Sequence, residues 1–208
     1  MPWIDRFFGM ACPVCGGALD APGVCLACRE ALVPERVGQA VYLGRYRRLR
    51  GLVRAVKFRR ARLALAWAAG RLADRVRSAG FRVDAVTFVP TLPWRALLRG
   101  QYPPAELARG IAGELGVPFL ALLYRRGYTP SQTRRRNRHR LPQVFAARGP
   151  APPSVLLADD VLTTGATFRR AAEALFSAGA ERVYGAFLAV ADPGRLLRLP
   201  YNPGGAGR

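Results

Sequence analysis

Short apolar runs alternate with amphipathic stretches along most of this chain. In residues 45–60, apolar side chains recur every three or four positions with arginines between them, which is typical of a helix with a basic outer face. The same criteria predict further helices over residues 61–80, 103–116 and 166–180. Nearly continuous apolar runs predict strands over residues 84–90, 118–125, 154–160 and 181–191.

Strands that alternate with helices and are apolar along nearly their whole length are typical of a parallel sheet covered on both faces. We therefore expect an α/β fold with a central, mostly parallel sheet and helices on both faces. Residues 33–41 indicate a connection into this domain, which is expected to span residues 33–194. Residues 195–208 are expected to be a C-terminal tail, frayed from residue 199 onward.

Four cysteines near the N-terminus form two Cys-x2-Cys pairs, separated by nine residues. They are Cys12, Cys15, Cys25 and Cys28. Two such pairs supply the four thiolates of a closed, tetrahedral structural Zn²⁺ site, whereas disulfides are rare in the cytosol and no cysteine is left over. We therefore predict that residues 1–32 form a small zinc ribbon or knuckle, whose metal has no open position for catalysis.

The chain is strongly basic. Lys and Arg number 33 against 13 acidic residues, a formal net charge of +20, and Lys57 is the single lysine. A GC-rich genome would explain arginine in place of lysine, but the surplus of positive charge indicates an anionic partner, either nucleic acid or a polyphosphorylated small molecule. Because no apolar run is long enough for a membrane span or a signal peptide, we expect a cytoplasmic protein without membrane insertion.

The sequence SVLLADDVLTTGATF, residues 154–168, combines two features of a ligand site. Asp159 and Asp160 end the predicted strand, and ligands of open α/β sheets bind beyond the carboxyl ends of strands. The next amides begin a helix, where unsatisfied N–H groups and the helix dipole favour an anion. A monophosphate is therefore expected on the loop, and the two carboxylates suit the vicinal hydroxyls of a ribose. The phosphate-binding residues would be Thr163, Thr164, Gly165 and Thr167.

Three other interpretations of this loop compete. The aspartates could serve only as helix caps. A Walker-B strand also ends in acidic residues, but the partner motif GxxxxGK[ST] is absent and Lys57 follows no glycine-rich loop. A Rossmann site requires GxGxxG after its first strand, and the sequence contains no such motif.

Residues 156–167 resemble the phosphoribosyl-pyrophosphate loop of type I phosphoribosyltransferases. Together with the double Cys-x2-Cys pattern, this makes the chain similar to the ComF competence-protein family over nearly its whole length. Further similar pieces are VKF after the first helix, VPTLPWRALLRG, and the series Gln132, Arg136, Asn137 and Phe145. The family usually has Arg-Gly-Phe-Asn-Gln where this chain has Arg-Gly-Gln-Tyr-Pro from Arg99, so Arg99 and Gly100 are retained and residues 101–103 differ.

The resemblance implies a type I phosphoribosyltransferase-like fold and a site for phosphoribosyl pyrophosphate with Mg²⁺. Asp159 and Asp160 would hold the ribose hydroxyls, partly through Mg²⁺, and the four loop residues named above would hold the 5-phosphate. Residues 91–95 would form the pyrophosphate-binding turn, with Arg99 in the ligand site, and residues 128–145 a hood that closes over it. If the chain is an enzyme, a nitrogen nucleophile displaces pyrophosphate at C1, and no residue stands out as a general base.

A second arginine-rich segment overlaps the expected hood. It contains Arg125, Arg126, Arg134, Arg135, Arg136, Arg138 and Arg140. We interpret it as a solvated loop, as a pyrophosphate clamp, or as a track for nucleic-acid phosphates, with Tyr124 or Tyr128 stacking on bases. The arginines of residues 45–60 could extend that track. His139 lies among these arginines and is expected to be a surface residue rather than a base or a ligand.

Two functions from different classes remain. The first is a competence-associated protein that binds single-stranded DNA and phosphoribosyl pyrophosphate during natural transformation, alongside other DNA-uptake or recombination proteins. The second is an active phosphoribosyltransferase, which transfers ribose 5-phosphate to a base or another nitrogen acceptor and releases pyrophosphate. The net charge of +20 exceeds what one small ligand requires and favours the first.

Overall fold

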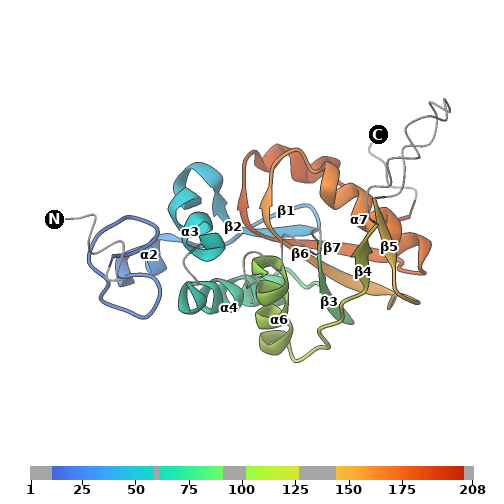
Figure 1. Ribbon diagram of the computed structural model, residues 1–208, viewed down its shortest axis with the longest axis horizontal. Coiled ribbons are helices and arrows are strands. Elements are labelled where there is room, and N and C mark those ends of the chain that lie inside the picture. The colour runs from blue at the N-terminus through green and yellow to red at the C-terminus, as the bar shows by residue number, and fades with distance from the viewer. Residues whose placement is uncertain (1–10, 59–60, 91–101, 127–143, 204–208) are drawn as a thin grey trace.

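A five-stranded sheet forms the centre of the molecule in the computed structural model, which describes residues 11–58, 61–90, 102–126 and 144–203 (Figure 1). The strand order is β1-β2-β7-β6-β3. The strands are β1 (Glu35–Val37), β2 (Ala40–Arg45), β3 (Ala85–Phe88), β6 (Ser154–Leu162) and β7 (Arg182–Val190). Only β1 is antiparallel to its neighbour, and all other pairs are parallel. This confirms the expected α/β fold with a mostly parallel sheet.

Helices cover both faces of the sheet (Figure 1). One face carries α3 (Tyr46–Phe58), α4 (Arg62–Ser78) and α6 (Pro103–Leu115), and the other carries α7 (Ala166–Ser177) and the 3-10 helix η2 (Pro193–Arg198). Along β6, Leu156 and Ala158 belong to the first core, whereas Val155 and Leu157 belong to the second. This alternation follows from the two-residue period of a strand, and it explains why the strand is apolar at every position from Val155 to Ala158.

The four predicted helices are confirmed within a few residues at each end. In α6, for example, Pro103 and Pro104 occupy the first turn, where no intrahelical amide is required. Gly116 ends the helix in the left-handed conformation with φ 71°, and its N–H donates to the carbonyl of Gly113 at 3.3 Å. Among the described residues, no helix has both the length and the hydropathy that a membrane span requires.

Two parts of the strand prediction are wrong. Residues 33–41, expected to be a connection, form β1, a turn at Gly38 with φ 58°, and the first part of β2. β1 has only three residues, too few for a periodic pattern. Most of the strand expected over residues 118–125 is irregular, with a single bridge between Val86 and Phe119. Only its end forms β4 (Leu123–Arg125), which pairs antiparallel with β5 (Phe145–Ala147) in a separate two-stranded sheet.

The fraying expected from residue 199 is also wrong for the first residues of that segment. Leu199 and Tyr201 are buried on the α7 side of the sheet. The Tyr201 hydroxyl donates to the carbonyl of Leu196 at 2.7 Å, and the N–H of Val183 donates to the carbonyl of Tyr201 at 2.9 Å. These apolar and hydrogen-bonded contacts outweigh the turn-forming tendency of the Pro- and Gly-rich composition.

The N-terminal cysteine module, residues 11–32 with α2 (Leu26–Ala31), packs directly on α3 and α4. Its Val24 and Leu32 belong to the same buried cluster as the sheet face beneath those helices. Two glycines mark points where backbones touch. A Cβ on Gly51 of α3 would lie 2.3 Å from the carbonyl oxygen of Pro13, and a Cβ on Gly23 would lie 2.4 Å from the amide nitrogen of Ala64. A side chain at either position would displace the module.

Substitution of Gly51 by alanine is expected to lower the free energy of unfolding by about 1–3 kcal/mol, the usual effect of overpacking a close contact. Gly113→Ala in α6 is the matched control, because no atom lies within 4 Å of its added Cβ. That variant is expected to gain about 1 kcal/mol from higher helix propensity. Urea unfolding of both variants measures the difference, and effects of the same sign would contradict close packing at Gly51.

Candidate functional site

The two aspartates lie within β6, which continues to Leu162 instead of ending at Asp160 as expected. β6 pairs with β7 as far as Leu162, and Asp159 is in register with Phe187. β7 supplies hydrogen-bonding partners beyond the apolar run, so tertiary pairing extends the strand through residues with low strand propensity. Asp159 and Asp160 are both half-buried at the carboxyl end of the parallel sheet.

The aspartate pair is held together by a short polar network. The N–H of Asp160 donates to Asp159 Oδ1 at 2.8 Å, and Lys57 Nζ lies 2.7 Å from Asp160 Oδ2. Burial raises the pKa of Asp159 well above its usual value, and the charge of Asp160 raises it further, whereas Lys57 lowers it. The site therefore combines an ion-paired carboxylate with a carboxyl group that retains its proton to unusually high pH.

Lys57 is a residue of this site that the sequence analysis does not assign to it. It lies in the last turn of α3, far from Asp160 in sequence, and the crossover from β2 through α3 brings it to the end of β6. The available signal is compositional, because Lys57 is the single lysine in a chain whose other cationic side chains are arginines. An ammonium group offers a compact point charge where a guanidinium would be bulkier and planar.

The loop after the aspartates is built as expected. Thr163 and Thr164 form the turn, and Gly165 and Thr167 stand at the start of α7. Gly165 has φ 79°, which favours glycine, and a Cβ there would lie 2.7 Å from Leu199 Cδ2.

The three threonines of this loop are exposed, and the Ala166 N–H donates to Thr164 Oγ1 at 3.4 Å. The threonines thus lie at and just before the N-terminus of a twelve-residue helix, with Thr164 Oγ1 bonded to its first amide. The amides and the dipole of such a helix end favour an anion.

Asp159→Asn is expected to stabilise the ligand-free protein at neutral pH. Because the folded state binds the Asp159 proton more tightly than the unfolded state, stability falls as pH rises from the ordinary aspartate pKa of 3.8 through the raised value. Each unit of raised pKa corresponds to about 1.4 kcal/mol at pH values above both. Asparagine removes the charge and keeps the oxygen that accepts from the Asp160 N–H. Thermal unfolding from pH 3 to pH 8 should show a gain that disappears at the acidic end, and a gain independent of pH would contradict this explanation.

The structure describes two of the seven arginines proposed for the nucleic-acid track. Arg125 ends β4 with its guanidinium carbon 5.8 Å from the centroid of the Phe145 ring, and Arg126 is exposed. Tyr124 is also exposed, with the guanidinium carbon of Arg148 5.6 Å from its ring centroid. Outside the described residues lie Arg99, residues 91–95, Tyr128, Gln132, Arg134, Arg135, Arg136, Asn137, Arg138, His139 and Arg140.

The four cysteine sulfurs come together in the N-terminal module. The Sγ atoms of Cys12, Cys15, Cys25 and Cys28 all lie within 4.8 Å of one another, and all four are free thiols. The Sγ atoms of Cys15 and Cys25 are 3.7 Å apart. Tetrahedral zinc with Zn–S bonds of about 2.3 Å requires a separation of about 3.8 Å between its sulfur ligands. The Gly17 N–H points at Cys15 Sγ at 3.4 Å, as in a metal knuckle. The cluster could hold a metal ion.

Comparisons with known proteins show what the fold of this chain is similar to. No protein family and no curated protein sequence matches this chain. The chain is similar to the solved structure of glutamine phosphoribosylpyrophosphate (PRPP) amidotransferase from B. subtilis, with 23% identity and a TM-score of 0.42 over 61% of this chain and 26% of that chain. The matched part of this chain thus spans about a quarter of the length of the amidotransferase. It is also similar to adenine phosphoribosyltransferase from Leishmania tarentolae, with 16% identity and a TM-score of 0.46 over 77% of this chain and 95% of that chain.

Proposed function

We propose that this chain binds phosphoribosyl pyrophosphate together with Mg²⁺ where β6 leads into α7. One observation carries the proposal: a half-buried aspartate pair is followed directly by a helix N-terminus with three exposed threonines in and beside it. The ribose hydroxyls would donate to Asp159 and Asp160. The 5-phosphate would accept from the loop amides and from the hydroxyls of Thr163, Thr164 and Thr167. Arg99 and residues 91–95 are proposed to contact the pyrophosphate.

Magnesium fits the acidic pair. Mg²⁺ usually binds one or two carboxylates and completes its shell with substrate phosphates and water. Lys57 pairs with Asp160 at 2.7 Å, so Mg²⁺ would bind the carboxylate oxygens that this ammonium leaves open and would displace the proton of Asp159. When bound, the metal would neutralise the pyrophosphate group, while the chain's own residues orient the ribose and its 5-phosphate.

We further propose that the chain acts as a ComF-like competence protein in the cytoplasm, binding single-stranded DNA alongside other DNA-uptake or recombination proteins. The net charge of +20 supports a polyanionic partner in addition to a small ligand. The four cysteines are proposed to hold a structural Zn²⁺. The division into a zinc module over residues 1–32, a main domain over residues 33–194 and a tail over residues 195–208 belongs to this proposal.

Calorimetry with phosphoribosyl pyrophosphate and Mg²⁺ tests the ligand site, and we expect one site per chain. If the titration produces no binding heat at any of several temperatures, the proposal is overturned. Repeating the titration with single-stranded DNA present measures the coupling between the two ligands. Release of pyrophosphate on addition of nitrogen acceptors would instead support an active phosphoribosyltransferase.

A further inference from the structure

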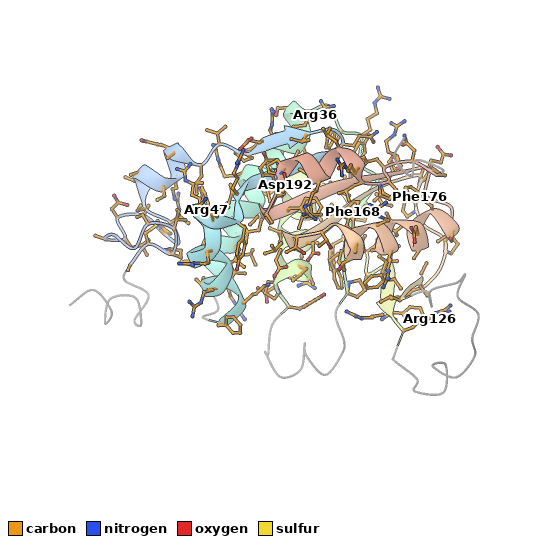
Figure 2. All side chains as sticks on the ribbon, turned by 90° about the horizontal axis from the view of Figure 1, so that it is seen from above. Arg36, Arg47, Arg126, Phe168, Phe176 and Asp192 are labelled. Carbon is orange, nitrogen blue, oxygen red and sulfur yellow. The ribbon has the colours of Figure 1, made fainter. Side chains whose placement is uncertain are left out.

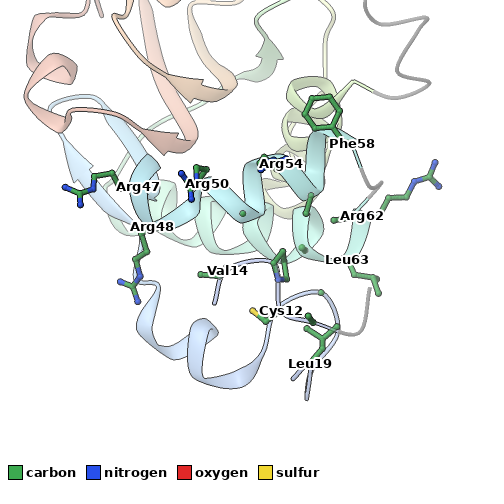
Figure 3. A pocket seen from close by; sticks show the side chains of 17 residues that line it. Cys12, Val14, Leu19, Arg47, Arg48, Arg50, Arg54, Phe58, Arg62 and Leu63 are labelled. Carbon is green, nitrogen blue, oxygen red and sulfur yellow. The ribbon is translucent and has the colours of Figure 1, made fainter. Parts of the chain in front are cut away.

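A groove of about 710 Å³ lies between the cysteine module and helices α3 and α4 (Figure 3). Its module wall is apolar and includes Pro13, Val14 and Leu19. Its helix wall carries five arginines: Arg47, Arg48, Arg50, Arg54 and Arg62. No acidic side chain is among its lining residues. The groove thus sets an apolar wall opposite a cationic one.

The five arginines are exposed, and none forms an ion pair with another of the described residues. Three of them, Arg47, Arg50 and Arg54, recur on successive turns of α3 and therefore share one side of that helix. At a rise of 1.5 Å per residue, this row is about 10 Å long. These solvated like charges repel one another only weakly, and together they attract an anion of matching length.

Two large apolar side chains lie beside the arginine row. Phe58 at the end of α3 is 68% exposed, and Leu63 near the start of α4 is 63% exposed. Both line the groove. An exposed aromatic ring in a basic groove is the usual arrangement for stacking of unpaired bases.

We infer that this groove binds single-stranded nucleic acid. A nucleotide joins a charged phosphate to an apolar base face. The cationic helix wall of the groove matches the phosphate, and the apolar module wall matches the base. The arginines would contact successive phosphates in the fork geometry of the guanidinium group, and the bases would lie against the module and Phe58. The inference rests on the proposed role in handling single-stranded DNA, and it assigns that role to a surface other than residues 125–140.

The groove lies apart from Arg126, the residue that follows β4. Figure 2 shows Arg47 and Arg126 toward opposite ends of the molecule. Arg47 and Arg126 are therefore well apart, and apart from Arg125 the rest of the arginine track expected from the sequence lies outside the described residues. A strand in the groove would instead run along α3, the helix whose Lys57 pairs with Asp160.

Fluorescence anisotropy with a labelled oligothymidylate tests the groove in the full-length, metal-loaded chain. Arg50→Ala with Arg54→Ala is expected to weaken binding about 25-fold at 0.1 M salt. Each lost phosphate contact lowers the slope of log affinity against log salt by about 0.7, so the slope should fall by about 1.4. The matched control is Arg182→Ala with Arg198→Ala, which removes the same charge from exposed positions outside the groove, and it should change the affinity less than threefold.

A second variant keeps the test independent of the arginine pair. Phe58→Ala removes an exposed ring, and the loss of one stacked base should weaken binding at least about fivefold without a change in salt slope. Three outcomes would each overturn the groove assignment. They are unchanged affinity in both groove variants, equal losses in the groove and control pairs, and displacement of the oligonucleotide by polyglutamate at equal charge. A wild-type chain that binds no oligonucleotide would overturn the proposed nucleic-acid role as well. Calorimetric binding of phosphoribosyl pyrophosphate is a separate readout that groove variants should retain.

Discussion

Replacing Asp159 and Asp160 together by alanine is expected to abolish measurable binding of phosphoribosyl pyrophosphate with Mg²⁺. The variant loses both proposed acceptors for the ribose hydroxyls and both proposed carboxylate ligands for the metal. Hydrogen bonds to charged groups contribute about 1.5–3 kcal/mol each, so two of them correspond to at least about 100-fold in affinity. Calorimetric titration of the wild-type and variant chains measures the loss.

The double variant should leave most of the affinity for single-stranded DNA intact, because neither aspartate lines the arginine groove. Asp74→Ala is a suitable control, since Asp74 is an exposed acid that pairs with Arg77 on the surface of α4. It should preserve both binding activities. Parallel loss of both ligands in the Asp159 and Asp160 variant, with the fold retained, would indicate one shared site and contradict the separation.

Removal of the proposed Zn²⁺ by a chelator is expected to unfold the cysteine module while the central sheet stays folded. Structural zinc sites contribute about 10–16 kcal/mol of binding free energy that small modules need in order to fold. Without the metal, four clustered thiols remain with one short helix, α2, too short to be stable by itself. Amide hydrogen exchange should show loss of protection in residues 11–32 and retention of protection in β6 and β7.

The packing of the cysteine module on the main domain determines how strongly loss of the metal destabilises that domain. Cys12, Val24 and Leu32 share a buried cluster with α3 and α4, so chelation should also lower the midpoint of main-domain unfolding. Cys15→Ser provides a second route to the same state, because it removes the most exposed ligand without a chelator. Cooperative loss of the whole fold on chelation would contradict a division into two modules. Since the module forms one wall of the arginine groove, chelation should also weaken oligonucleotide binding while sparing phosphoribosyl pyrophosphate binding.

Local regularities of the sequence were sufficient to determine much of this protein. The helical period of residues 45–60 and the apolar run of residues 154–158 predicted α3 and the buried part of β6, because each signal lies within a single element. The spacing of the cysteines predicted the sulfur cluster, since Cys12 and Cys15 share one turn and Cys25 and Cys28 share the first turn of α2. The glycine at the start of α7 was likewise predictable from its neighbours.

Features that join segments distant in the sequence could be found only in the tertiary structure. β1 and β4 are three-residue strands that exist because a partner strand is present, and β6 continues through its aspartates because β7 pairs with it. Lys57 reaches Asp160 only after the α3 crossover has folded back on the sheet. The arginine groove depends on the module docking against Gly51 and Ala64. Such features depend on relative positions of elements, and periodicity within one element carries no information about them.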